Sequence, residues 1–143
     1  MLDTKTTTPY AALLLRVSMG VMFLAHGALL KLGTFGLAGT MGFFGSIGYP
    51  PVFGAIVTFA EIGAGIALIA GVGVRTVSLL SIPIMVGAII QHLPSGWMFS
   101  NPRGGWEFPA FWTVTLVVQA LLGAGAHAIR LPGLPEIGEP RTA

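Results

Sequence analysis

Long hydrophobic runs, separated by short polar or glycine-rich segments, dominate the chain. An α-helix rises about 1.5 Å per residue, so about 20 apolar residues cross the hydrocarbon core of a bilayer. Four runs of about this length are present, over residues 9–32, 51–72, 74–93 and 109–129. The pattern predicts an all-α fold in which residues 1–143 form one domain, an integral membrane four-helix bundle.

Proline and glycine mark the joints between these runs. Pro9 opens the first run, where its missing N–H would have no helical partner in any case. Gly71 and Gly73 predict a tight turn between the second and third runs. The segment "GTFGLAGTMGFFGSIGYP", residues 33–50, is too irregular to cross the bilayer. We expect it to lie at the membrane interface or to pack back as a short helix.

The composition supports a membrane protein and narrows its chemistry. Hydrophobic residues make up 54% of the chain and charged residues 8%, whereas about 25% of an average soluble domain is charged. The formal charge of +2 is small and scattered, so nucleic acid is not an expected partner. With no cysteine, thiol chemistry and thiolate-bound clusters are excluded. A redox role would therefore need a bound cofactor or a partner subunit.

The basic residues predict how the chain is oriented. Four fall on the face that holds both termini and two on the opposite face: Lys5, Arg75, Arg130 and Arg141 against Lys31 and Arg103. The positive-inside rule then places both termini in the cytoplasm. We expect a multi-pass protein of the bacterial cytoplasmic (inner) membrane, with the loop after residue 93 facing outward.

Three ionisable side chains lie inside the predicted spans, namely Arg16, His26 and Glu61. Each costs about 2.5 to 3.5 kcal/mol near the bilayer centre unless it is compensated. At 100° per residue, Arg16 falls within about 60° of Gly20, Gly27 and Lys31. Glu61 shares a similar stripe on the second run with Gly54, Thr58, Gly65 and Leu68.

Small residues beside each charge let helix backbones approach closely in lipid. We therefore predict an Arg16–Glu61 ion pair between the first two spans, with His26 nearer the outer side. If all three face one cavity, they form a ladder through half the membrane. The alternative is that the ion pair is purely structural and that His26 forms its hydrogen bonds elsewhere.

The stretch "HLPSGWMFSNPRGGWEFPAFW", residues 92–112, gathers charges and aromatic rings at the outer face. A mixed-charge pocket under aromatic rings would suit a small anion or the polar head of a quinone. The simpler readings are an interfacial tryptophan belt and a carboxylate that caps a helix start. We take His26 and Glu61 as candidate proton-transfer residues. The candidate ligand-binding residues are Arg16, His26, Lys31, Glu61, His92, Trp97, Trp106 and Glu107.

A metal site is not predicted, because neither closely spaced histidines nor a carboxylate cluster occurs. A heme held by His26 and His92 is compatible with their expected depths and is the weaker alternative. A quinone is the cofactor that the expected pocket fits best.

Four stretches resemble the DoxX family of small bacterial four-helix membrane proteins: "RVSMGVMFLAHGALLKL", "FAEIGAGIALIAGV", "GVGVRTVSLLSIPIM" and "HLPSGWMFSNPRGGWEF". The resemblance covers about residues 10–127. Its most specific part is His92 followed by Gly104, Gly105, Trp106 and Glu107.

The resemblance implies a role near membrane redox chemistry. One relative forms part of a thiosulfate–quinone oxidoreductase, and another is an integral subunit beside a superoxide dismutase and a sulfurtransferase in oxidative-stress defence. We therefore expect an integral membrane subunit of an oxidoreductase or oxidative-stress system that binds quinone or a small sulfur-containing substrate in its outward pocket. The alternatives are a small-molecule transporter or permease that forms a homodimer, and a membrane scaffold that recruits soluble redox enzymes.

Overall fold

The computed structural model describes residues 3–131, which contain helices and loops and no strand. This confirms the predicted all-α class for the described part of the chain. The elements are α1 (Thr4–Leu24), the π-helix η1 (Ala25–Thr34), α2 (Gly36–Ser46), α3 (Val52–Ala70), α4 (Val74–His92), the short 3₁₀ helix η2 (Leu93–Ser95) and α5 (Glu107–Leu122).

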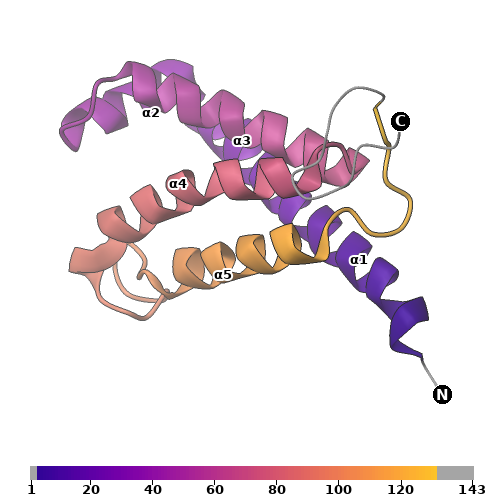
Figure 1. The fold of residues 1–143 in the computed structure, drawn as a ribbon. Helices are drawn as coiled ribbons and strands as arrows, with labels where there is room; N and C mark the ends of the chain where they lie inside the picture. Colours follow the sequence, from indigo (N-terminus) through magenta and orange to yellow (C-terminus); the bar gives the residue numbers. More distant parts are fainter. Residues whose placement is uncertain (1–2, 132–143) are drawn as a thin grey trace.

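The long helices pack in sequence around a shared interior (Figure 1). Helix α1 packs along α3, α3 along α4 and α4 along α5, and α5 also contacts α1. Helix α2 folds back onto α3 and η1, which confirms the prediction of a short helix in the glycine-rich segment. Gly71 and Gly73, with φ of 78° and 56°, form the predicted tight turn between α3 and α4.

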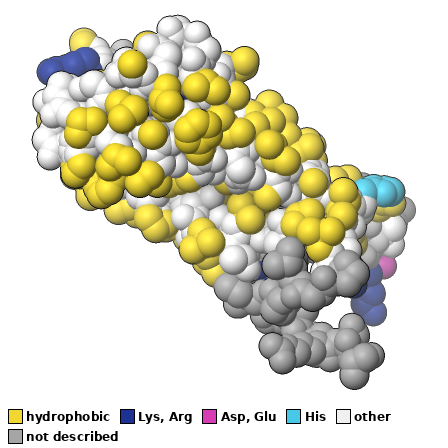
Figure 2. All heavy atoms as spheres, turned by 90° about the horizontal axis from the view of Figure 1, so that it is seen from above, with side chains coloured by type: hydrophobic (Ala, Val, Ile, Leu, Met, Phe, Trp, Pro, Cys, Tyr) yellow, Lys and Arg dark blue, Asp and Glu magenta, His cyan; other side chains and the backbone are white. Residues whose placement is uncertain are grey.

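Three helical stretches are long and apolar enough to cross a membrane: Thr4–Thr34, Val52–Ala70 and Val74–Ser95. Figure 2 shows a broad hydrophobic surface with charged and histidine side chains only toward its two ends. Leu14, Leu80 and Leu121 are each about 70% exposed, as expected for side chains that face lipid. The fourth crossing and the cytoplasmic location of the termini stay predictions.

The fourth predicted span is wrong at its end, because α5 stops at Leu122 rather than continuing to residue 129. Gly123, Gly125 and His127 have φ of 78°, 71° and 51°, and this left-handed backbone is incompatible with an α-helix. The side-chain amide of Gln119 donates to the Gly123 carbonyl at 2.8 Å. At 16 residues, α5 is shorter than the three helical stretches that could cross a membrane.

The segment after α5 turns back to the start of α1 and the end of α3. The backbone N–H of Ala126 donates to the Pro9 carbonyl at 2.9 Å, and that of Ile129 donates to the Ala70 carbonyl at 3.1 Å. The described residues nearest the two termini therefore lie at one end of the molecule.

Arg16 holds this end together and does not pair with Glu61. Its side chain is completely buried. Its guanidinium donates five hydrogen bonds of 2.6 to 2.9 Å to backbone carbonyls, those of Leu68, Ile69, Ala124, Ala126 and His127. The predicted Arg16–Glu61 ion pair is therefore wrong.

The ends of α3 and α5 explain why Arg16 binds backbone carbonyls. The last carbonyls of a helix have no intrahelical N–H partner, and Gly71 ends α3 directly after the turn that contains Leu68 and Ile69. The left-handed residues after α5 expose three more carbonyls. A guanidinium carries five N–H donors and no acceptor, so it can satisfy all five carbonyls at once.

The predicted close approach of the first two spans at their small residues is confirmed. A Cβ atom added to Gly20 would lie 2.8 Å from the Gly65 carbonyl oxygen, and one on Gly27 would lie 2.9 Å from the Thr58 carbonyl oxygen. The buried residues of α3 are Gly54, Thr58, Glu61, Ala64, Gly65 and Leu68. Glu61 thus faces the interior as its stripe predicted.

Candidate functional site

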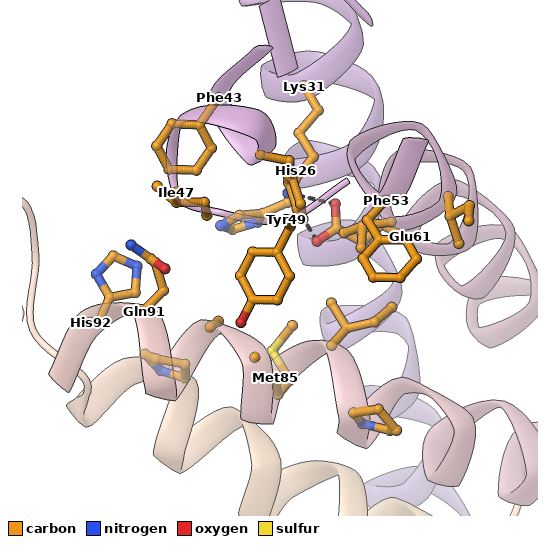
Figure 3. Close-up of a pocket in the computed structure, with 18 of the residues that line it drawn as sticks. His26, Lys31, Phe43, Ile47, Tyr49, Phe53, Glu61, Met85, Gln91 and His92 are labelled. Atoms are coloured by element: carbon orange, nitrogen blue, oxygen red, sulfur yellow. Dashed lines mark hydrogen bonds and ion pairs between the residues drawn. The ribbon is translucent and has the colours of Figure 1, made fainter. Parts of the chain in front are cut away.

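A cavity of about 580 Å³ lies between η1, α2, α3, α4 and α5 (Figure 3). Aromatic side chains from α2 and the following segment form one wall, and α4 and α5 form the opposite wall. The aromatic lining residues are Phe43, Phe44, Tyr49, Phe53, Phe108 and Trp112. The cavity is mainly apolar, with its polar groups at particular corners.

The first polar corner is an ion pair between Lys31 and Glu61. Lys31 Nζ lies 2.7 Å from Glu61 Oε2 and 3.0 Å from Oε1. The side chain of Glu61 is 4% exposed and that of Lys31 is 20% exposed. Because both carboxylate oxygens accept from the same ammonium group, neither charge is left uncompensated inside the protein.

The π-helix brings Lys31 to this position beside His26. Hydrogen bonds in a π-helix join residues five apart, as the 2.9 Å bond from Phe35 N to the Leu30 carbonyl shows. His26 and Lys31 are also five residues apart, so they lie on one face of η1. Figure 3 shows them together with Glu61 at one side of the cavity. Such π segments occur frequently at functional sites.

The hydrogen bond of His26 assigns its neutral tautomer. Nδ1 lies 2.9 Å from the Met22 carbonyl oxygen. A carbonyl can only accept, so in the neutral ring Nδ1 carries the proton and Nε2 is an acceptor. The imidazole meets the Trp112 ring edge-on, with centroids 5.2 Å apart.

Trp112 contributes an unused donor to the same region. It lines the cavity and is 4% exposed. Its indole N–H has no hydrogen-bond partner within the described residues. Buried indole N–H groups normally find a partner, so the indole N–H of Trp112 is an exception in the described part of the chain.

The second polar corner lies at the end of α4. His92 and Gln91 line the cavity there, on the side away from Glu61 (Figure 3). His92 Nδ1 lies 3.1 Å from the Arg103 carbonyl oxygen, which ties the ring to the loop between α4 and α5. Tyr49 reaches into the space between the two corners.

Three candidate residues do not line the cavity: Trp97 and Trp106 belong to the loop before α5, and Glu107 is the first residue of α5. Glu107 Oε1 accepts a 2.7 Å hydrogen bond from the Phe99 backbone N–H. The rings of Trp97 and Trp106 meet edge-on with centroids 4.5 Å apart. These contacts order the loop that closes this end of the molecule.

The cavity thus joins four of the eight candidate ligand-binding residues: His26, Lys31, Glu61 and His92. The aromatic wall was not predicted from the sequence, because most of it comes from the segment expected at the membrane interface. The close spacing of Phe43, Phe44, Tyr49 and Phe53 was the available signal. Met85 and Trp112 were also not predicted, because a methionine or a tryptophan in a predicted span is typical of packing or of the membrane interface.

The comparison with known families gives one match. A family model described as DoxX matches residues 11–93. This range contains η1, α2, α3 and α4, and therefore all four candidate residues that line the cavity. No curated protein and no solved structure matches the chain.

Proposed function

The chain belongs to the DoxX family of membrane proteins, and from that premise we propose that its cavity binds the headgroup of a quinone. In this proposal the protein is an integral subunit of a membrane oxidoreductase or oxidative-stress system. The supporting observation is a mainly apolar cavity of about 580 Å³ with an ion pair, two histidines and an indole N–H that has no partner in residues 3–131. A bound quinone would supply an acceptor for two electrons and two protons.

The residues of the cavity fit such a group. Ligand pockets commonly have volumes of about 300 to 1,000 Å³, with apolar walls and a few convergent polar groups. The aromatic side chains offer faces and edges against which a flat ring can pack. Trp112 can donate to an oxygen, and Tyr49 carries a hydroxyl that can donate or accept.

The polar corner gives each residue a separate role. Lys31 compensates the charge of Glu61 and holds its carboxylate in place through two hydrogen bonds. His26 has an acceptor nitrogen and its other nitrogen donates to a carbonyl, so the ring can take a proton at Nε2. We assign proton transfer to His26 and Glu61, and contact with the ligand to His26, His92 and Trp112.

We also propose an orientation of the protein in the membrane. Both termini would face the cytoplasm of a bacterial inner membrane, with the cavity toward the outer half of the bilayer. His26 and Lys31 lie at the end of the first helical stretch that is distant from the N-terminus, and His92 ends α4. This placement would let the ligand tail remain in lipid.

The competing functions make less use of this geometry. A sulfur-containing anion would need a free cation, whereas Lys31 is already paired with Glu61. A transporter path through Arg16, Glu61 and His26 would need Arg16 in the cavity, yet its guanidinium is bound to five carbonyls elsewhere. A scaffold that recruits soluble redox enzymes has no use for the cavity.

Replacing Gly87 by phenylalanine tests the proposal by filling the cavity. Gly87 lines the cavity, and a Cβ atom added there meets no atom within 4 Å. We expect Gly87→Phe to raise the Kd for decylubiquinone by about tenfold or more, as an added ring competes with the ligand for space. Quenching of tryptophan fluorescence in detergent solution would measure the binding.

Gly63→Phe is the matched control. Gly63 lies on α3, is exposed, does not line the cavity, and also has open space around an added Cβ atom. This variant should bind the quinone with the affinity of the native protein. Equal affinities for Gly87→Phe and the native protein would place the quinone site elsewhere.

A further inference from the structure

Two polar atoms on the cavity wall remain unused after the internal hydrogen bonds are assigned. His26 Nδ1 donates to the Met22 carbonyl, which leaves Nε2 as an acceptor without a partner among the described residues. The Trp112 indole N–H is a donor that also lacks a partner there. The two rings are neighbours, with centroids 5.2 Å apart. Two neighbouring rings of the cavity lining therefore carry one free donor and one free acceptor.

A hydroxyl group is the functional group that complements this pair. It can accept from the indole N–H through a lone pair and donate its own proton to the imidazole nitrogen. A carbonyl or ether oxygen can accept from Trp112, but it would set its lone pairs against the lone pair of His26. Setting the lone pairs of a carbonyl oxygen against the His26 acceptor leaves that acceptor without a hydrogen bond, so the corner discriminates between hydroxyl and carbonyl oxygens.

Resting on the proposed function, we propose that this corner recognises one aromatic hydroxyl group, which accepts from Trp112 and donates to His26. The cavity then binds a hydroquinone more tightly than the corresponding quinone. The shared chemistry is a hydroxyl on an apolar aromatic ring, so a simple alkylphenol should occupy the same corner.

The other polar groups of the cavity are already engaged or more exposed. Lys31 donates to both carboxylate oxygens of Glu61. Tyr49 is 41% exposed, and Gln91 is also exposed, so water competes at both. By contrast, Trp112 is buried and packs against Phe108, with ring centroids 5.7 Å apart. A hydrogen bond from this buried donor contributes more than one at the exposed side.

A redox-inert pair of probes tests the inference in the native protein. 4-Heptylphenol and its methyl ether share the same ring and tail, but only the phenol can donate a hydrogen bond. We expect the phenol to bind about tenfold more tightly, as measured by titration calorimetry in lipid nanodiscs. The same order should hold for decylubiquinol over decylubiquinone under anaerobic conditions. Equal affinities within the phenol and ether pair would overturn the inference.

Two variants assign the selectivity to the named atoms. His26→Phe keeps a flat ring but removes the acceptor, so affinity for the phenol should fall to that for the ether, which should change little. Trp112→Phe removes the shared donor and should weaken both probes. A phenol preference that survives in His26→Phe would also overturn the inference.

The native-protein results separate this inference from the proposed function. Quinone and hydroquinone binding with equal affinity would leave the proposed function standing and refute the hydroxyl selectivity. If neither the quinone nor the hydroquinone binds, the proposed function itself fails. The ¹⁵N chemical shifts of the His26 ring provide an independent check, because a bound phenol should shift Nε2 and leave Nδ1 nearly unchanged.

Discussion

Arg16→Lys is expected to lower the free energy of unfolding by about 3 kcal/mol or more, because hydrogen bonds to charged groups contribute about 1.5 to 3 kcal/mol each. Arg16 is fully buried and donates to five carbonyls from α3 and the segment after α5. Lysine keeps the charge but concentrates three donors on one atom, so it cannot reach both sets of carbonyls. Chemical unfolding in detergent, followed by circular dichroism, would measure the change.

The matched control for this prediction is Arg103→Lys. Arg103 is exposed in the loop between α4 and α5, so its replacement should alter stability by less than about 0.5 kcal/mol. Trypsin cleavage after Arg130 should also become faster in Arg16→Lys, since the segment loses hydrogen bonds to the Arg16 side chain. Equal stability of the two variants would show that the five hydrogen bonds contribute nothing beyond charge.

Breaking the Lys31–Glu61 pair is the second large expected effect. Lys31→Met leaves a carboxylate that is almost fully buried without its partner, and removal of one member of a buried ion pair costs about 3 to 5 kcal/mol. Glu61→Met leaves the ammonium group in the same position and should cost a similar amount. The double variant removes both charges and should recover most of the stability.

A double-mutant cycle of unfolding free energies measures the coupling between these residues. We expect the two single changes to be strongly non-additive, with an interaction energy of about 2 kcal/mol or more. Lys5→Met is the control, since Lys5 lies exposed near the start of α1. Additive effects would contradict the ion pair as the polar anchor of the cavity.

The spans and the interior face of α3 could be predicted because their signals are local. Apolar length predicts a helix that crosses the bilayer, and α3 and α4 begin and end within two residues of the predicted bounds. The stripe of Gly54, Thr58, Glu61 and Gly65 identified the interior face, because small residues and a charge both avoid lipid.

The partner of Arg16 could not be predicted, because its acceptors are backbone groups. Side-chain chemistry suggested Glu61, the nearest opposite charge by depth. The actual acceptors exist because α3 ends at Gly71 and the chain after α5 adopts left-handed conformations. A backbone carbonyl without a helical partner changes neither the hydropathy nor the charge of the sequence, so the sequence does not reveal it.

The partner of Glu61 was missed for a related reason. A periodicity of 100° per residue assumes an α-helix, whereas residues 25–34 form a π-helix. The change of register places Lys31 and His26 together beside Glu61. The aromatic wall was missed because an irregular glycine-rich segment gave no prediction of which rings would turn inward.

Photolabelling with an azido-quinone tests the central claim most directly, namely that the cavity beside Lys31 and Glu61 is the quinone site. We predict saturable labelling of cavity residues such as Tyr49 and Met85, mapped by mass spectrometry. Excess decylubiquinone should abolish the labelling, and Gly87→Phe should reduce it strongly. Labelling of lipid-facing residues such as Leu80 and Leu121, without competition by excess quinone, would contradict the claim.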